Sequence, residues 1–351
     1  MTGAGHGPDS EVVDAARVEQ ARASSGPHNG RRAWRWLRGV LLVVGAALVL
    51  GSAVAVLARL TGWEGGPLAY GVALLPWLTA GAALAVLLGV VMRSRALVAA
   101  ALAVSAAGGW WLLPLYSSAG HIPSGSPALT VATLNLTVGG ADAGSVVALL
   151  RDRGIDVLAL DELTPVARAR LQAAGLDKLM PYSIARPEAG VTGTGLWSRH
   201  PLMSPAPVDG FVSRAVRAGI SGPGGLLSVL AVHPAAPGPF HHDRWDADTA
   251  HLRNVLDGAD GSVLVLGDLN TTRDHRAFRD IEDLGYVDAA VQAGAGLQPT
   301  FPQGRAPIPL FAIDHVLARG ASIRAGLVST VPIPGADHRA LVVQYFDALN
   351  R

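Results

Sequence analysis

Three long apolar runs constrain the fold of this chain more than any other feature. They cover residues 39–58, 67–92 and 96–116, and none of them contains Asp, Glu, Lys, Arg or His. A helix needs about 20 apolar residues to cross the ~30 Å hydrocarbon core of a bilayer. The runs therefore predict three transmembrane helices and a membrane anchor over residues 31–116. A cleaved signal peptide is the alternative for the first run, but two further runs follow it.

Arginines are distributed unevenly around these runs. Four of them lie within the eight residues directly before the first run, Arg93 and Arg95 separate the second run from the third, and only Arg59 lies in the first connection. Because cytoplasmic loops carry an excess of basic residues, we expect a cytoplasmic N-terminus and an extracytoplasmic C-terminal part. The runs hold no ionisable residue, which favours an anchor in the lipid bilayer over a transporter.

The remaining sequence divides by composition. Residues 1–30 are rich in Gly, Ser and Ala and predict a disordered cytoplasmic tail, and residues 117–127 predict a linker. From residue 128 to 351, short apolar runs alternate with amphipathic stretches, as in an α/β domain. Residues 117–351 hold 28 − 9 = 19 basic and 27 − 5 = 22 acidic residues, a balance of −3 that disfavours nucleic acid as a partner. The absence of cysteine excludes disulfides and cysteine-bound zinc.

The pattern of this domain predicts seven strands and four helices. The strands cover 129–135, 157–160, 195–198, 226–232, 263–266, 311–317 and 341–345. The helices cover 143–153, 165–174, 243–256 and 275–284, and Asp274 or Thr272 is the expected cap of the last one.

Polar residues follow or lie within six of these strands. The clearest case is VLVLGDLN over 263–270, where Asp268 and Asn270 lie two residues apart after a buried strand. The others are Asn135, the pair Asp161 and Glu162, His233, the pair Asp314 and His315, and the pair Asp337 and His338. Each residue alone is typical of a turn or a surface. All are residue types that could take part in phosphate or metal chemistry, and the carboxyl end of a strand in an α/β sheet is where ligands usually lie.

In this order and spacing, the residues resemble the endonuclease/exonuclease/phosphatase superfamily, which includes the DNase I-like nucleases. The resemblance covers residues 128–346, and its most specific segments are GDLN at 267–270 and DHRAL at 337–341. It implies an α/β fold, a four-layer sandwich of two mixed β-sheets flanked by helices, here preceded by three transmembrane helices. The layout is similar to that of membrane-anchored bacterial members, including actinobacterial teicoplanin-resistance membrane proteins.

The resemblance also implies a metal site. Glu162 and Asp337 would hold Mg²⁺ or Mn²⁺, and Asn135 would lie with them and position phosphate oxygens. Hard oxygen ligands of this kind suit these cations.

Five further residues take catalytic roles by the same resemblance. Asp268 would orient and deprotonate the attacking water, and Asn270 would position a phosphate oxygen. His338, held by Asp314, and His233 would donate hydrogen bonds to the phosphoryl oxygens as their charge builds up.

Several residues leave alternatives open. Asp161 replaces the Gln of many members, so it could join the metal shell or face a neighbouring turn, and Ala336 replaces a usual Ser. Arg199 could lie near the scissile group or form a structural ion pair. The segment with His241, His242 and His251 is interpreted as a helix start rather than a second metal site.

We therefore predict a membrane-anchored, extracytoplasmic, metal-dependent phosphoesterase that acts on a phosphodiester or phosphomonoester. A phosphorylated small molecule, lipid or cell-envelope intermediate is the preferred substrate, because the anchor holds the domain beside the bilayer. The alternatives are an extracellular nuclease and a non-catalytic ligand-binding or resistance protein with the same fold.

Overall fold

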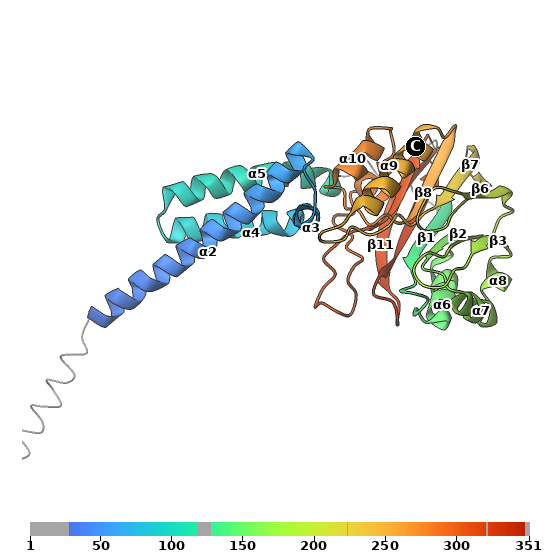
Figure 1. Cartoon of the computed structure of the whole chain (residues 1–351), viewed down its shortest axis with the longest axis horizontal. Coiled ribbons are helices and arrows are strands. Elements are labelled where there is room, and N and C mark those ends of the chain that lie inside the picture. Colours follow the sequence, from blue (N-terminus) through green and yellow to red (C-terminus); the bar gives the residue numbers. More distant parts are fainter. Residues whose placement is uncertain (1–27, 118–127, 223, 321, 348–351) are drawn as a thin grey trace, which may run out of the picture.

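The computed structural model describes residues 28–117, 128–222, 224–320 and 322–347. It shows a helical part, residues 28–117, placed end to end with an α/β domain, residues 128–347 (Figure 1). Residues 1–27 of the predicted tail and residues 118–127 of the predicted linker lie outside the described residues.

The helical part contains α2 (His28–Thr61), α3 (Pro67–Ala73), α4 (Leu75–Val91) and α5 (Arg95–Tyr116). Among the described residues, α2 and α5 are long and apolar enough to cross a membrane. The second predicted span is broken, because α3 and α4 are bent by 69° and make a third span only if the pair is counted as one. The break lies at Leu74, just before Pro76 in the first turn of α4, where proline supplies no N–H to a continuous helix.

The α/β domain contains two six-stranded sheets, as the fold prediction requires. The first sheet has the order β11-β12-β1-β2-β4-β3. Its strands are β1 (Leu129–Asn135), β2 (Val157–Asp161), β3 (Tyr182–Arg186), β4 (Thr194–Ser198), β11 (Ile323–Pro332) and β12 (Arg339–Asp347). The second sheet has the order β5-β6-β7-β8-β10-β9. Its strands are β5 (Met203–Val208), β6 (Ala215–Gly222), β7 (Gly225–Ala231), β8 (Ser262–Asp268), β9 (Val287–Asp288) and β10 (Asp314–Arg319). Both sheets are mixed, since the β1–β2 and β7–β8 pairs are parallel.

Helices cover the outer faces of the sheets. They are α6 (Ala143–Arg153), α7 (Pro165–Ala174), α8 (Leu176–Leu179), α9 (Asp243–Asp257) and α10 (Arg276–Glu282). The short α11 (Ala289–Ala293) instead contacts β10 and β11, one strand of each sheet, and its Ala289 enters the core between the sheets. The predicted bounds of α6 and α7 are confirmed. The predicted cap of α10 was wrong: its N-cap is His275, which makes no side-chain cap bond, and the Glu64 carboxylate accepts the Arg276 N–H instead.

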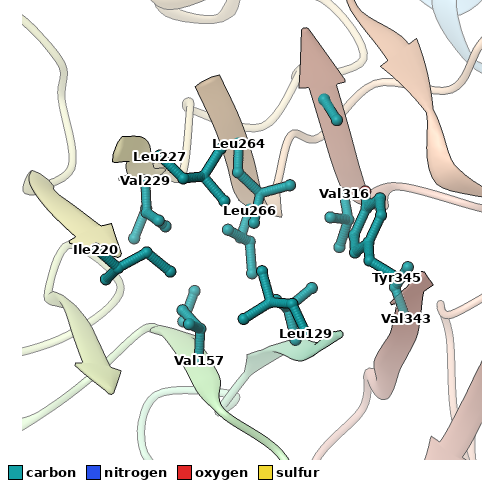
Figure 2. Close-up of a cluster of buried hydrophobic side chains, with 14 of the residues drawn as sticks. Leu129, Val157, Ile220, Leu227, Val229, Leu264, Leu266, Val316, Val343 and Tyr345 are labelled. Carbon is teal, nitrogen blue, oxygen red and sulfur yellow. The ribbon is translucent and has the colours of Figure 1, made fainter. Parts of the chain in front are cut away.

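The hydrophobic core lies between the sheets (Figure 2). Side chains of a strand alternate between its two faces, so every second residue of β1, β2, β7 and β8 enters this core. It includes Leu129, Val157, Val229 and Leu264. The intervening residues pack outward against α6 and α7 on one side and against α9 and α10 on the other. This arrangement is the predicted four-layer sandwich.

Candidate active site

Four strands carry a polar residue at a position that continues the core-facing series. Asn135 and Asp161 end β1 and β2, Asp268 ends β8, and Asp314 begins β10. On each strand, the residues two and four positions further into the strand belong to the core between the sheets. The one exception is Thr133 on β1, which is buried but polar. The register pairs Asn135 with Asp161 and Asp314 with Asp268. Because alternate side chains share a face, the four polar groups meet at one edge of the sandwich.

A cleft of about 820 Å³ opens at this edge. Seven of the eight predicted site residues line it: Asn135, Glu162, His233, Asp268, Asn270, Asp337 and His338. The eighth, Asp314, is buried and accepts a hydrogen bond from His338. The structure therefore brings together all eight residues, which come from segments up to 203 positions apart (338 − 135).

Asp268, His338 and Asp314 form a buried chain of charges. The Nδ1 atom of His338 lies 2.8 Å from Asp314 Oδ2, and its Nε2 lies 3.7 Å from Asp268 Oδ2. Burial opposes the imidazolium, but the attraction of Asp314 and Asp268 outweighs it and raises the pKa of His338 to about 10. Burial also raises the pKa of Asp268, and His338 counteracts this effect. Their ligand atoms lie within 4.8 Å of one another, a spacing that could hold a metal ion.

His233 and Asn270 complete the wall around Asp268. His233 Nε2 lies 3.7 Å from Asp268 Oδ2, and its buried Nδ1 has no hydrogen-bond partner within the described part of the chain. The Asn270 backbone N–H donates to Asp268 Oδ1 at 2.9 Å, and the Asn270 side-chain amide donates to the Pro234 carbonyl. Asp268 is therefore held from both sides, while the imidazole of His233 keeps unused hydrogen-bonding capacity.

Glu162 and Asp337 line another part of the cleft wall, and Asn135 lies between Glu162 and Asp268. The Asn135 amide donates to both Glu162 Oε1 and Asp268 Oδ2 at 3.1 Å. Asp337 Oδ1 accepts from the Thr137 hydroxyl at 2.5 Å, and its Oδ2 pairs with Arg305 at 3.1 Å. This wall supplies carboxylate oxygens, which are ligands for a hard cation.

Backbone strain concentrates beside these residues. Thr137, Val138, Glu162 and Asn270 all have φ between 49° and 53°. This left-handed conformation is unfavourable for β-branched residues such as Thr137 and Val138. It persists where surrounding contacts fix it, and here the Val138 N–H donates to Glu162 Oε2 at 2.5 Å.

Asp161 does not line the cleft. Its side chain is fully buried, and Oδ2 accepts the backbone N–H of Asp268 at 2.9 Å. Burial raises its pKa well above the ordinary range of a carboxyl. Gly267 makes this contact possible, because a Cβ there would lie 1.9 Å from the Val232 carbonyl oxygen. Of the two alternatives for Asp161, the structure shows the one facing a neighbouring backbone segment.

Both alternatives for Arg199 were wrong. Its guanidinium donates to the Leu150 carbonyl on α6, and it does not line the cleft. His242 pairs with Asp246, and His251 contacts the Asp209 carbonyl, so these two histidines are engaged separately.

Other cleft residues were missed by sequence reasoning. Thr137, Val138, His241 and Arg305 line the cleft or bind its acids. The position of Thr137 and Val138 just after Asn135 was a usable signal. Arg305 lies in an exposed loop without periodicity, so only the folded structure places it beside Asp337.

Comparisons with known proteins agree with this geometry. Residues 132–338 match the Endonuclease/Exonuclease/phosphatase family. No curated protein matches the chain in sequence. An AP endonuclease from Archaeoglobus fulgidus superposes with a TM-score of 0.51 at 18% identity, covering 62% of this chain and 99% of that one.

Two further solved structures share the fold. A 3'-5' exonuclease from Neisseria meningitidis has a TM-score of 0.50 at 18% identity and covers 62% of this chain and 100% of its own. An endonuclease/exonuclease/phosphatase from Beutenbergia cavernae has a TM-score of 0.50 at 20% identity, with coverages of 62% and 71%. The family match covers more than half of the sequence, and the solved structures have the same architecture. The chain therefore belongs to the Endonuclease/Exonuclease/phosphatase family.

Proposed function

We propose that this protein is a membrane-anchored phosphoesterase that depends on a divalent cation and hydrolyses a phosphodiester or phosphomonoester outside the cytoplasm. The observation that carries the proposal is a single cleft lined by Asp268 and by the carboxylates of Glu162 and Asp337. His338 lies between Asp268 and the buried Asp314 and contacts both. Phosphoryl transfer to water uses a general base, a positively charged hydrogen-bond donor and oxygen ligands for a hard cation, and this cleft contains groups of each kind.

The residues around Asp268 give it the role of general base. Its Oδ2 lies 3.7 Å from the Nε2 atoms of both His233 and His338, so a water held there would be beside two donors for phosphate oxygens. His338 is protonated and oriented by Asp314, and therefore stabilises negative charge that develops on the phosphoryl group. Asn270 fixes the Asp268 carboxylate through its backbone N–H.

The part of the cleft wall that holds Glu162 and Asp337 fits Mg²⁺ or Mn²⁺. Glu162 and Asp337 would hold the cation, and the Asn135 amide positions Glu162 for this role. When bound, such a cation polarises a phosphoryl oxygen and neutralises charge. The carboxylates of Glu162 and Asp337 both line the open cleft, where a cation could reach their oxygens.

The substrate class follows from the helical part. Two to three helices that can span a membrane directly precede the domain, so a lipid or cell-envelope phosphate is the preferred substrate. The second candidate is nuclease activity, which is favoured by one observation: a solved neighbour of the same fold is a 3'-5' exonuclease from Neisseria meningitidis. The net charge of −3 over residues 117–351, from 19 basic and 22 acidic residues, favours the first candidate.

The test uses the purified full-length chain in detergent micelles. Hydrolysis of bis(4-nitrophenyl) phosphate, 4-nitrophenyl phosphate, phosphatidic acid and plasmid DNA is measured with Mg²⁺, with Mn²⁺ and with EDTA. We expect metal-dependent hydrolysis of a phosphate ester that EDTA and Asp268→Asn abolish. Inactivity of the wild type on every substrate, or full activity of Asp268→Asn, refutes the proposal and leaves a binding protein. DNA turnover far above that of phosphatidic acid selects the nuclease.

A further inference from the structure

A second, apolar hollow lies between α3 and the α/β domain. It has a volume of about 250 Å³ and is lined mainly by apolar atoms. Ala69 and Ala73 of α3 form one wall, and Phe311 and Ile313 of the segment before β10 form the other. We call it the α3 groove.

The α3 groove is continuous with the catalytic cleft. Asn270 and His338 line both spaces, as do Ala236 and Phe301. The ring centroid of Phe301 lies 4.8 Å from that of His338, so an aromatic side chain stands where the two spaces join. A molecule with its phosphate near His338 therefore has an apolar channel directly beside it.

Hydrogen bonds hold α3 against the domain. His275 Nε2 lies 3.0 Å from the Ala69 carbonyl oxygen, and the Tyr70 hydroxyl donates to the Pro237 carbonyl at 2.7 Å. Just beyond α3, the Trp77 indole N–H donates to the Leu310 carbonyl at 2.8 Å. These bonds fix both walls, so the groove is a built feature of the fold.

Exposed aromatic residues surround this junction. Phe240 is 78% exposed and Trp63 is 73% exposed. The Phe240 loop lies close to the start of α3, since a Cβ on Gly66 would lie 3.4 Å from the Pro239 carbonyl oxygen. Tryptophan and large apolar side chains at the end of membrane-spanning helices are typical of the bilayer interface. Both side chains are therefore of the kind that suits a bilayer interface beside α3.

We propose that the α3 groove receives the alkyl chain of a membrane lipid phosphate ester whose phosphate lies in the catalytic cleft. This inference rests on the proposed function and specifies its substrate. Three observations support it: the groove shares four residues with the cleft, its lining is apolar, and α3 belongs to the bent helix pair of the helical part.

The test compares two diesters in micelles, butyl 4-nitrophenyl phosphate and dodecyl 4-nitrophenyl phosphate. Water adds to phosphorus, the bond to the nitrophenol oxygen breaks, and 4-nitrophenolate and the alkyl phosphate are released with protons. Each methylene that leaves water for an apolar site strengthens binding about fourfold. We expect kcat/KM of the wild type to favour the dodecyl ester, and Ala73→Phe, which fills the groove, to reduce the dodecyl-to-butyl ratio at least about tenfold.

Ala83→Phe is the matched control, because Ala83 is exposed on α4 and does not line the groove. Partition of the dodecyl ester into micelles is the same for every variant and cancels in the comparison. Phe311→Ala provides a second variant, which removes one wall without adding volume and should also lower the ratio. An unchanged ratio in both groove variants overturns the inference while the phosphoesterase proposal stands. If the wild type hydrolyses neither ester but remains active on 4-nitrophenyl phosphate or phosphatidic acid, the inference fails and the phosphoesterase proposal stands. If it is inactive on every one of these substrates, both proposals fail.

Discussion

Asp268 is the residue on which the chemistry of the cleft depends. Its carboxylate is buried, its backbone N–H is bound by Asp161, and its oxygens are directed by Asn135 and Asn270. His338 and His233 supply the only side chains described within 4.0 Å of it that can carry positive charge. A base held this rigidly needs little reorganisation when it meets a water molecule.

Asp314 orients His338, and its removal should affect activity without removing a group from the cleft. We expect Asp314→Asn to lower kcat/KM on a soluble phosphodiester about 10²–10⁴-fold, because the amide cannot stabilise the imidazolium. Asp246→Asn is the control, since Asp246 pairs with His242 on an exposed surface. Equal kcat/KM for Asp314→Asn and the wild type would contradict this role.

Asp161 should be needed for its hydrogen bond rather than for its charge. Asp161→Asn keeps an oxygen that can accept the Asp268 N–H, whereas Asp161→Ala leaves that N–H buried without a partner. We expect Asp161→Ala to reduce the free energy of unfolding by about 1–3 kcal/mol and Asp161→Asn to reduce it less. Thermal unfolding of both variants in micelles measures the difference. Equal losses in the two variants would show that the charge matters.

The cleft residues were predicted from their resemblance to the motifs of the Endonuclease/Exonuclease/phosphatase family, and the apolar pattern explains why several of them meet. Asn135, Asp268 and Asp314 continue the core-facing positions of their strands. Because side chains alternate between the two faces of a strand, these three meet at the same edge of the sandwich. The partners Thr137 and Arg305 could not be predicted in the same way. Each acts through a contact with Asp337, far away in sequence, which exists only after the sheets pack.

At the scale of elements, α10 and α3 connect the domain to the helical part. Glu64, between α2 and α3, accepts the first N–H of α10, and Arg59 of α2 pairs with Asp274 at 2.8 Å. His275, the N-cap of α10, contacts the Ala69 carbonyl on α3. The sequence pattern predicted α10 but placed its cap wrongly. The carboxylate that accepts the first N–H of α10 belongs to Glu64, which lies outside the domain and far away in sequence.

Buried ionisable groups at this junction should respond to acid in opposite directions. Burial lowers the pKa of His275 from its ordinary value of 6.5 to about 4, so its contribution to stability is fully present above pH 6.5 and is lost as the pH falls toward 4, by about 3 kcal/mol. Burial raises the pKa of Glu64 from 4.5 to about 7, so its contribution is fully present below pH 4.5 and is lost as the pH rises through 7. Thermal unfolding of the wild type and His275→Gln in micelles between pH 7 and pH 4 separates the two effects. The variant should lose less stability in acid than the wild type, and an identical slope in that variant would refute the assignment.

Edge strands and the helix break escaped prediction for local reasons. β3 and β5 lie at sheet edges and are largely exposed, so their residues carry no apolar run. β10 begins at Asp314 rather than Phe311, because Phe311 makes only an isolated bridge with Phe301. The bend at Leu74 was readable from Pro76, but the uncharged run concealed it.

At the scale of the whole molecule, the α/β domain is placed at one end of the helical part (Figure 1). The cleft and the α3 groove both open near this junction, since they share Asn270 and His338. The arrangement favours a substrate that is itself held at a membrane surface.

The arginine distribution is the basis for the proposal that the domain lies outside the cytoplasm. A phosphatase reporter fused after Tyr116 should be active, because such reporters fold only outside the cytoplasm. A β-galactosidase-type reporter at the same position should be inactive. Fusion after Arg93 should give the opposite pair of results. Cytoplasmic activity of the Tyr116 fusion would reverse the proposed topology.

The proposed hydrolysis depends on two neighbouring sites in one cleft: a cation at Glu162 and Asp337, and a base at Asp268. Anomalous scattering from crystals of the full-length protein grown with Mn²⁺ locates the cation directly. We predict a manganese peak within bonding distance of Glu162 and Asp337 oxygens that Asp337→Ala weakens or removes. A cleft without a peak, or a peak bound by Asp268, Asp314 and His338 in place of their hydrogen bonds, would contradict the account.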